Sequence, residues 1–188
     1  MENKKLKIGF QGVKGAFSYV CAKTLFPNDE IISFESFMEV ANAVENGEIN
    51  YGILPYENIY AGEVVEVKKI LQERADKIKI TDKITISVIH NLCGLQGAKM
   101  EDITHIFSHW QALKQCRETL QKIAPNAVLV EKESTAMSAE YVKKQQNKNY
   151  ACICSKMACE ENNLAILQDA IQDSKENQTS FVVIASLN

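Results

Sequence analysis

The sequence predicts an α/β protein with two lobes and mostly parallel sheets. Apolar strand-like runs alternate with amphipathic helix-like runs along the whole chain, a pattern typical of β-α-β units. The alternation completes one β-α-β-α-β unit by residue 56 and starts again near residue 103. A chain of 188 residues is long enough for two small lobes, and no Gly/Ser/Pro-rich linker separates the two units. We therefore expect long strands to connect the lobes.

The first unit contains three predicted strands, 5–11, 31–34 and 51–56. A predicted helix, 15–25, lies between the first two strands and ends before Pro27. Ser36 and Glu39 form a capping box, so a second helix begins there, and Gly47 ends it. A third helix is expected over 63–73.

The second unit repeats the alternation. Its predicted strands are 84–92, 103–107, 127–130, 150–154 and 179–185. Ser108 and Gln111 have the spacing of a second capping box, and the helix that follows them ends before Pro125. Two further helices are expected over 135–145 and 156–162.

The connections set the expected division of the chain. We expect strand 84–92 and the region 166–174 to cross between the lobes. This gives a single domain, 1–188, whose lobe 1 comprises about 1–83 plus 171–188 and whose lobe 2 comprises about 84–170. A ligand site is then expected in a cleft between the lobes.

Composition and charge exclude several classes of function. The net charge is −3, and the densest positive cluster, Lys143, Lys144 and Lys148, lies among Gln and Asn residues as a solvated helix end would. Nucleic-acid binding is therefore not expected. The sequence has no run of about 18 apolar residues and its first residues form no apolar signal core, so we expect a cytoplasmic protein without a membrane contact.

The six cysteines predict buried thiols and no metal site. Without a secretory signal they are expected to be reduced. Cys152 and Cys154 occupy alternate positions of a strand, and Cys159 falls on the next helix. A zinc site would require a CxxC-type pair and a second pair elsewhere.

A glycine-rich turn follows the first strand, from Gly9 to Ser18. Such turns allow backbone N–H groups to approach an anion at a helix N-terminus. The alternative is a tight connection between a strand and a helix without a ligand. The turn lacks the Gly-Lys-Ser/Thr spacing of a phosphate-binding loop.

Polar groups follow other strands of the predicted sheets. Glu57 and Asn58 follow the third strand, where α/β proteins place ligand-binding groups, although Asn58 could instead bond its own backbone in a turn. Ser108 and His109 come at the end of another strand, where a capped helix N-terminus presents free amides. Ser134 lies at the next such junction.

These segments, in this order, resemble the motifs of prephenate dehydratases. The matching segments are Gly12-Val13-Lys14-Gly15-Ala16-Phe17-Ser18, Pro55-Tyr56-Glu57-Asn58, Ser108-His109-Trp110-Gln111-Ala112-Leu113, Glu133-Ser134-Thr135-Ala136 and Thr179-Ser180-Phe181. The resemblance covers residues 7–184. The chain departs from the family pattern at several motif positions. These are Val13 for Pro, Ala16 for Thr, Ile59 for Ser, Val65 for Asn, Trp110 for Pro, Glu133 for Ser and Ser180 for Arg.

The resemblance implies a fold like that of type II periplasmic binding proteins. It also implies that the chain converts prephenate to phenylpyruvate in phenylalanine biosynthesis, with Thr179 as the catalytic hydroxyl and with no metal or cofactor. The implied substrate-binding residues are Gly15, Ser18, Glu57, Asn58, Gly62, Ser108, His109, Gln111, Ser134, Thr135, Ser180 and Phe181.

Ser180 keeps other functions open. In the family an arginine at this position is a plausible carboxylate clamp, and serine cannot supply its charge. One alternative is a catalytically silent module that binds another small acid. Others are an arogenate dehydratase and a prephenate decarboxylase.

The resemblance also bears on assembly and regulation. Feedback-regulated members carry an ACT domain after this one, whereas this chain stops at Asn188, which fits either a naturally short protein or a part of a longer one. Dimers are common in the family, so we expect a homodimer with a small-molecule substrate as its ligand.

Overall fold

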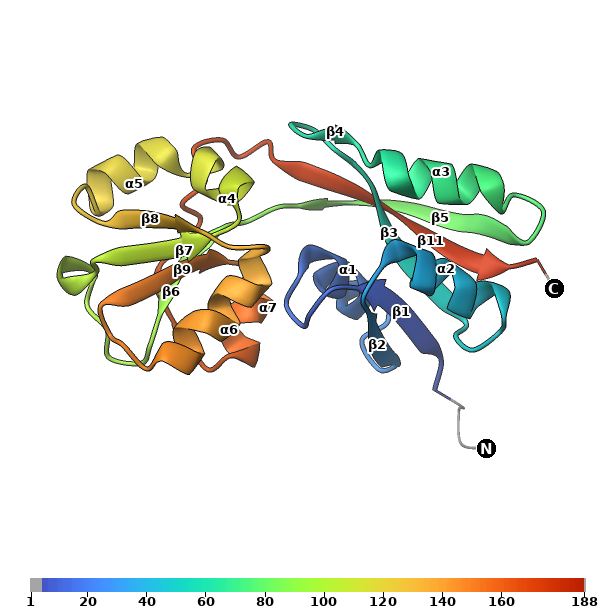
Figure 1. The fold of residues 1–188 in the computed structure, drawn as a ribbon, viewed down its shortest axis with the longest axis horizontal. Coiled ribbons are helices and arrows are strands. Elements are labelled where there is room, and N and C mark those ends of the chain that lie inside the picture. The colour runs from blue at the N-terminus through green and yellow to red at the C-terminus, as the bar shows by residue number, and fades with distance from the viewer. Residues whose placement is uncertain (1–4, 188) are drawn as a thin grey trace. The chain divides into compact units, whose positions relative to one another are not determined.

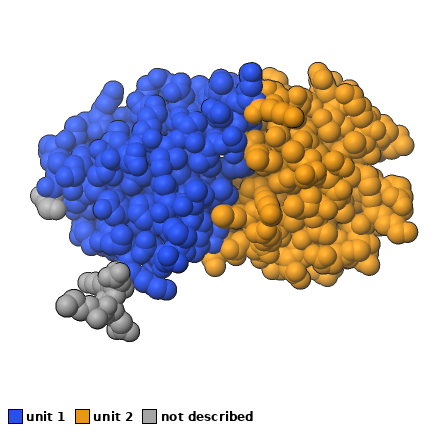
Figure 2. Space-filling model, turned by 180° about the vertical axis from the view of Figure 1, so that it is seen from behind, with its two compact units in different colours: residues 1–13, 17–87, 176–188 blue, residues 14–16, 88–175 orange. Residues whose placement is uncertain are grey.

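The computed structural model describes residues 5–187, which form two compact units (Figures 1 and 2). Unit 1 comprises residues 5–13, 17–87 and 176–187, and unit 2 comprises residues 14–16 and 88–175. The boundaries differ from the predicted lobes by a few residues. Strand β5 continues to Ser87, which keeps 84–87 in unit 1, and the segment 171–175 bonds to residues of unit 2.

Unit 1 is built on a sheet in the order β2-β1-β3-β11-β5, with the short β4 beside β3 (Figure 1). Its strands are β1 (Lys7–Gln11), β2 (Glu30–Phe34), β3 (Tyr51–Asn58), β4 (Gly62–Glu63), β5 (Ile78–Ser87) and β11 (Gln178–Ser186). Strands β2, β1 and β3 pair in parallel, as β-α-β connections require. Strand β11 runs antiparallel to both of its neighbours.

Three helices cover this sheet: α1 (Phe17–Leu25), α2 (Phe37–Glu45) and α3 (Val65–Glu73). The capping box at Ser36 and Glu39 is formed as predicted. Helices α2 and α3 share one core cluster with strand residues such as Leu54, Val182 and Ile184. These helices therefore cover one face of the sheet.

Unit 2 contains a second sheet, in the order β10-β6-β9-β7-β8. Its strands are β6 (Asn91–Gly94), β7 (His105–Ser108), β8 (Val128–Glu131), β9 (Tyr150–Cys154) and β10 (Ala165–Gln168). Its helices are η1 (Met100–Asp102), α4 (Trp110–Gln115), α5 (Arg117–Ile123), α6 (Thr135–Gln145) and α7 (Lys156–Glu161). Strands β8, β7 and β9 pair in parallel, and β6 runs antiparallel to β9 and β10.

Both sheets are mixed, with one reversed strand on the path of each. The reversed strands, β11 and β6, follow the segments that carry the chain from one unit into the other, whereas a helix precedes each of the other strands on these paths except β1. The α/β class with two sheets is thus confirmed. The predicted strand 84–92 is instead two strands, because β5 ends at Ser87 and β6 begins at Asn91 in the other sheet.

The second predicted capping box does not form. The Ser108 side chain is buried and its hydroxyl donates to the Ile153 carbonyl at 2.8 Å, so it does not accept from the helix. His109 is the N-cap instead, and the predicted helix is interrupted at Cys116 into α4 and α5. Within residues 5–187 no helix is both long enough and apolar enough to cross a bilayer.

Candidate functional site

The predicted catalytic residue, Thr179, lies near the start of β11 directly opposite Asn58 of β3. The Asn58 amide Nδ2 donates to the Thr179 Oγ1 at 2.9 Å. Both side chains are half-buried. The hydroxyl of Thr179 has no acceptor among the described residues, so its proton remains available to a ligand.

The other end of the same amide holds the turn between β3 and β4. Asn58 Oδ1 accepts from the backbone N–H groups of Tyr60 and Ala61, both at 3.0 Å. Because Oδ1 is occupied by two donors, Nδ2 has to face Thr179. The sequence left open whether Asn58 binds a ligand or makes a turn, and the structure shows that it makes the turn and also holds Thr179.

Asn177 belongs to this group although the sequence analysis did not single it out. Its Oδ1 lies 3.0 Å from Asn58 Nδ2, and the residue is only 2% exposed. The carbonyl of Gln178 lies 2.9 Å from the same nitrogen. An asparagine two residues before Thr179 was the signal available in the sequence.

Glu57 and Gly62 lie beside this group, Glu57 on β3 and Gly62 on β4. Gly62 pairs with Asn58, and its φ of 77° explains why glycine stands there. Glu57 is exposed and lies opposite Glu63, whose carboxylate is bonded to the Lys68 ammonium. The Glu63 carboxylate raises the pKa of Lys68.

Ser180 and Thr179 point to opposite faces of the sheet. Side chains alternate along a strand, and Val182, two residues after Ser180, packs in the cluster under α2 and α3. The Ser180 hydroxyl lies 2.8 Å from the Thr85 Oγ1 of β5. The strand therefore directs position 180 to the face of the sheet opposite Thr179.

Phe181 shares the face of Thr179 but is only 1% exposed, so it is a core residue below the site. Ser18 is 8% exposed in the first turn of α1, which leaves little of it accessible to a ligand. Both of these predicted substrate contacts are therefore largely covered by protein.

Gly15 packs closely against other residues of unit 2. Its φ is 88°, and a Cβ at this position would lie 2.4 Å from the Cα of Ala158. Its carbonyl accepts from the Ser155 hydroxyl at 2.6 Å, and Ser155 also caps α7. The requirement for glycine here comes from backbone conformation and close approach.

The remaining predicted site residues belong to unit 2 and lie beyond one edge of its sheet. Strands β7 and β8 are parallel, with Ser108 opposite Glu131, so the segments that follow them emerge at the same edge. The first segment contains His109 and Gln111, and the second contains Ser134 and Thr135.

His109 and Ser134 both cap helices. The Nδ1 of His109 accepts from the Gln111 N–H at 3.4 Å, and the Ser134 hydroxyl accepts from the Met137 N–H at 3.1 Å. Burial lowers the pKa of His109, a shift that the nearby Glu131 carboxylate opposes. The unprotonated ring is therefore favoured, which fits its role as an acceptor.

The cysteines have the properties of structural thiols. All six are free and buried. Burial raises the pKa of Cys21 and of Cys116 to about 12, so both remain protonated and poor nucleophiles. Among residues 5–187 no group of His, Cys, Asp or Glu side chains has the arrangement of a metal site.

The chain is similar to known proteins over nearly its whole length. The family model for prephenate dehydratase matches residues 8–188. The arogenate dehydratase/prephenate dehydratase 6 of Arabidopsis thaliana chloroplasts is 33% identical over 185 residues, which are 98% of this chain and 44% of that protein. The prephenate dehydratase of Lactococcus lactis is 32% identical over 177 residues, covering 94% of this chain and 62% of that protein.

A solved structure shows the same fold. The prephenate dehydratase of Arthrobacter aurescens, solved in complex with L-Phe, superimposes with a TM-score of 0.86 at 24% identity, over 97% of this chain and 61% of that one. The chain thus spans less than half of the plant relative and less than two thirds of these bacterial proteins. Because the family model covers nearly the whole sequence, the chain belongs to the prephenate dehydratase family.

Proposed function

We propose that this chain is the catalytic domain of a prephenate dehydratase and that Thr179 acts on the departing hydroxyl. The observation that carries the proposal is the 2.9 Å hydrogen bond from the Asn58 amide to the Thr179 Oγ1. Because the oxygen accepts from Asn58, its own proton is directed elsewhere. A donor without an acceptor is the group that a leaving hydroxide needs.

The reaction requires little from the protein beyond such donors. Prephenate, a dianion, loses CO2 from the ring carbon while the C–O bond to the ring hydroxyl breaks. The electron pair of the carboxylate C–C bond enters the ring, which becomes aromatic, and the hydroxide leaves as water after taking one proton. Phenylpyruvate, CO2 and water then balance prephenate and that proton.

Thr179 stabilises the negative charge that develops on the leaving oxygen. A threonine hydroxyl is a weak acid, so the proton that completes the water comes from solvent, and Thr179 contributes a hydrogen bond that strengthens as the C–O bond lengthens. One such donor is worth about 3 kcal/mol, or roughly a hundredfold in kcat, in comparable oxyanion sites.

The substrate contacts of unit 2 belong to the same proposal. The segments of His109, Gln111, Ser134 and Thr135 supply polar side chains and the N-terminal amides of α6, which suit a carboxylate. The arogenate activity in the name of the Arabidopsis relative makes the amino analogue of prephenate a second substrate to test.

The test is turnover of prephenate at neutral pH by the purified protein, followed as phenylpyruvate absorbance in alkali. We expect turnover by the wild type, a loss of about a hundredfold or more in Thr179→Ala, and partial retention in Thr179→Ser, which keeps the hydroxyl. No wild-type turnover above the uncatalysed rate, with the fold intact by circular dichroism, would reject the proposal. Arogenate would give phenylalanine in place of phenylpyruvate, so a parallel incubation with arogenate, with phenylalanine measured by chromatography, assigns the substrate.

We further propose a cytoplasmic homodimer. The support is the resemblance to a family in which dimers are common. Sedimentation equilibrium over a range of protein concentrations measures the assembly, and a concentration-independent monomer mass would contradict it.

A further inference from the structure

Two adjoining hollows lie on unit 2. One has a volume of about 650 Å³ and the other about 280 Å³, within the range of small-molecule sites when taken together. They share three lining residues, Lys143, Gln146 and Asn162, so they form one groove, which we call the lysine groove. The remaining lining residues are Lys14, Glu140, Lys144 and Glu161 in the larger hollow and Leu95, Gln96, Lys148 and Asn163 in the smaller one.

The backbone shapes the groove where two helices end. Gln146, after α6, and Asn163, just after α7, both have left-handed backbone conformations, with φ values of 52° and 53°. Such residues turn the chain sharply at a helix C-terminus. Asn162 is only 7% exposed, and its amide donates to the Ala158 carbonyl at 2.9 Å, so the floor of the groove is fixed.

The charge of the groove is positive. Four ammonium groups line it, from Lys14, Lys143, Lys144 and Lys148, against the carboxylates of Glu140 and Glu161. Over the described part of the chain, none of these four lysines takes part in an ion pair. Four ammonium groups outnumber the two carboxylates, so like charges in the groove repel one another, and a bound anion would relieve that repulsion.

Lys14 comes from a distant part of the sequence. It lies in the glycine-rich turn, whose next residue, Gly15, is fastened to unit 2 by the 2.6 Å bond from Ser155. The turn therefore contributes a side-chain ammonium to the groove. The sequence suggested that this turn could bind an anion through its backbone amides. In the structure, the group that the turn offers to an anion is the Lys14 ammonium.

We propose that the lysine groove binds a small phosphorylated metabolite carrying at least two negative charges. Lysine ammonium groups are compact charges that bind phosphate, and the groove gathers four of them. The side-chain amides of Gln96, Gln146 and Asn163 and the Glu140 carboxylate can bond hydroxyl or amino groups of the same ligand. This site is separate from the dehydratase chemistry proposed for Thr179.

The test is isothermal titration of the full chain with inorganic pyrophosphate at low ionic strength. The double variant Lys143→Gln/Lys144→Gln should bind at least about tenfold more weakly, since each charged hydrogen bond contributes about 1.5 kcal/mol or more. The control, Lys114→Gln/Lys122→Gln, removes the same charge from exposed helix positions of unit 2 outside the groove and should bind as the wild type does. Equal weakening in both double variants, or in neither, would overturn the proposal.

Two further arms identify the ligand class and separate it from catalysis. Citrate should bind more weakly than pyrophosphate, and equal or tighter binding of citrate would overturn the assignment to phosphate. Thr179→Ala should bind pyrophosphate as the wild type does whether or not the chain turns over prephenate. A loss of binding in Thr179→Ala would place the anion at the catalytic group and reject a separate site.

Discussion

At the scale of single residues, the Asn58 side chain connects the β3–β4 turn to the hydroxyl of Thr179. Its oxygen accepts two backbone N–H groups, and its nitrogen donates to Oγ1. These two roles require the two different ends of a carboxamide, so aspartate and alanine should fail in different ways.

We predict that Asn58→Asp keeps the turn and loses activity. Aspartate still accepts from the Tyr60 and Ala61 N–H groups, but it presents an oxygen to Thr179, whose proton is then donated to the carboxylate. The kcat of prephenate turnover should fall about a hundredfold. The urea midpoint should fall as well, because the new oxygen also faces the Asn177 Oδ1 and the Gln178 carbonyl, to which the Asn58 nitrogen donates. Asn58→Ala should lower both kcat and the midpoint. An active Asn58→Asp enzyme would contradict the assignment.

The substitution of serine for the family arginine at position 180 should have little effect on chemistry. Ser180 points away from Thr179 and bonds Thr85. Ser180→Ala and Ser180→Arg should therefore both keep kcat/KM within about threefold of the wild type. A large gain in Ser180→Arg alone would show that the arginine reaches the substrate after all.

The sequence predicted the parts of the site that depend on local pattern. Strand-to-helix junctions and the cap at Ser134 could be located because their signals lie within a few residues of one another. The buried bond of Ser108 to Ile153 spans 45 residues and has no local signal. Strand alternation in the sequence predicts the face to which Ser180 points. The family motif concerns the residue type at this position and carries no information on the face of the sheet.

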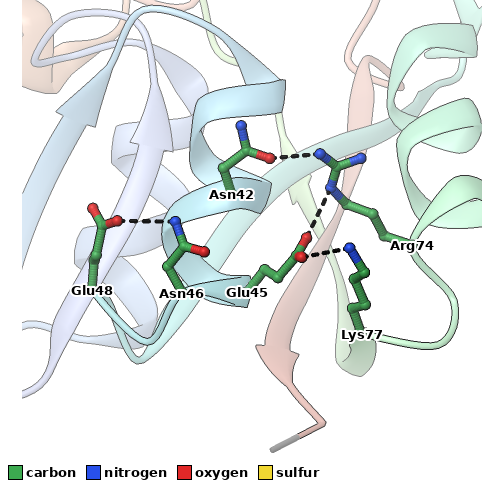
Figure 3. A network of polar contacts seen from close by, with 6 residues as sticks. All are labelled: Asn42, Glu45, Asn46, Glu48, Arg74 and Lys77. Carbon is green, nitrogen blue, oxygen red and sulfur yellow. Dashed lines mark hydrogen bonds and ion pairs between the residues drawn. The ribbon is translucent and has the colours of Figure 1, made fainter.

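At the scale of elements, a polar network joins α2 to the end of α3 (Figure 3). The Arg74 Nε lies 3.3 Å from a Glu45 carboxylate oxygen, and another guanidinium nitrogen donates to the Asn42 Oδ1 at 2.6 Å. Lys77 contacts the other oxygen of Glu45 at 2.7 Å. The role of Arg74 has no local signal in the sequence, because its partner Asn42 lies 32 residues earlier in the chain.

Arg74 should matter more to stability than Lys77. The Arg74 side chain is 20% exposed and bonds two partners, whereas Lys77 is 51% exposed and bonds one. Arg74→Met should lower the free energy of unfolding by about 1 kcal/mol, and Lys77→Met by a few tenths. Urea denaturation measures both, and an equal effect of the two substitutions would contradict the difference in burial.

At the scale of the whole molecule, His90 fastens together the two segments through which the chain leaves and re-enters unit 1. Its backbone N–H donates to Gln172 at 3.0 Å, and its carbonyl accepts from the Ile171 N–H at 2.8 Å. Its Nε2 lies 2.9 Å from the Gln115 Oε1. Nearby, Asp173 accepts from the Glu118 and Thr119 N–H groups, which attaches the second segment to α5.

Burial lowers the pKa of His90, and this makes stability depend on pH. The unfolded state takes up a proton near pH 6.5, and the folded state only at lower pH. The contribution of the neutral, buried His90 ring to the free energy of unfolding is therefore complete above about pH 6.5. It is lost as the pH falls toward the pKa of the folded state. Between about pH 7 and about pH 5, the free energy of unfolding measured in urea should decrease less for His90→Gln than for the wild type. Equal decreases would contradict the prediction.

Strand β11 (red in Figure 1) occupies an interior place in its sheet although it comes last in the sequence. It lies between β3 and β5, so β5 has no partner in this sheet until residues 178–186 are present. A nascent chain emerging from the ribosome can complete the sheet of unit 2 earlier, because that sheet ends at Gln168. Until then the sheet of unit 1 is incomplete, and the unpaired edges of β3 and β5 favour aggregation. The segment that closes this gap also delivers Thr179, so a chain whose synthesis stops early gains neither a finished sheet nor a reactive hydroxyl.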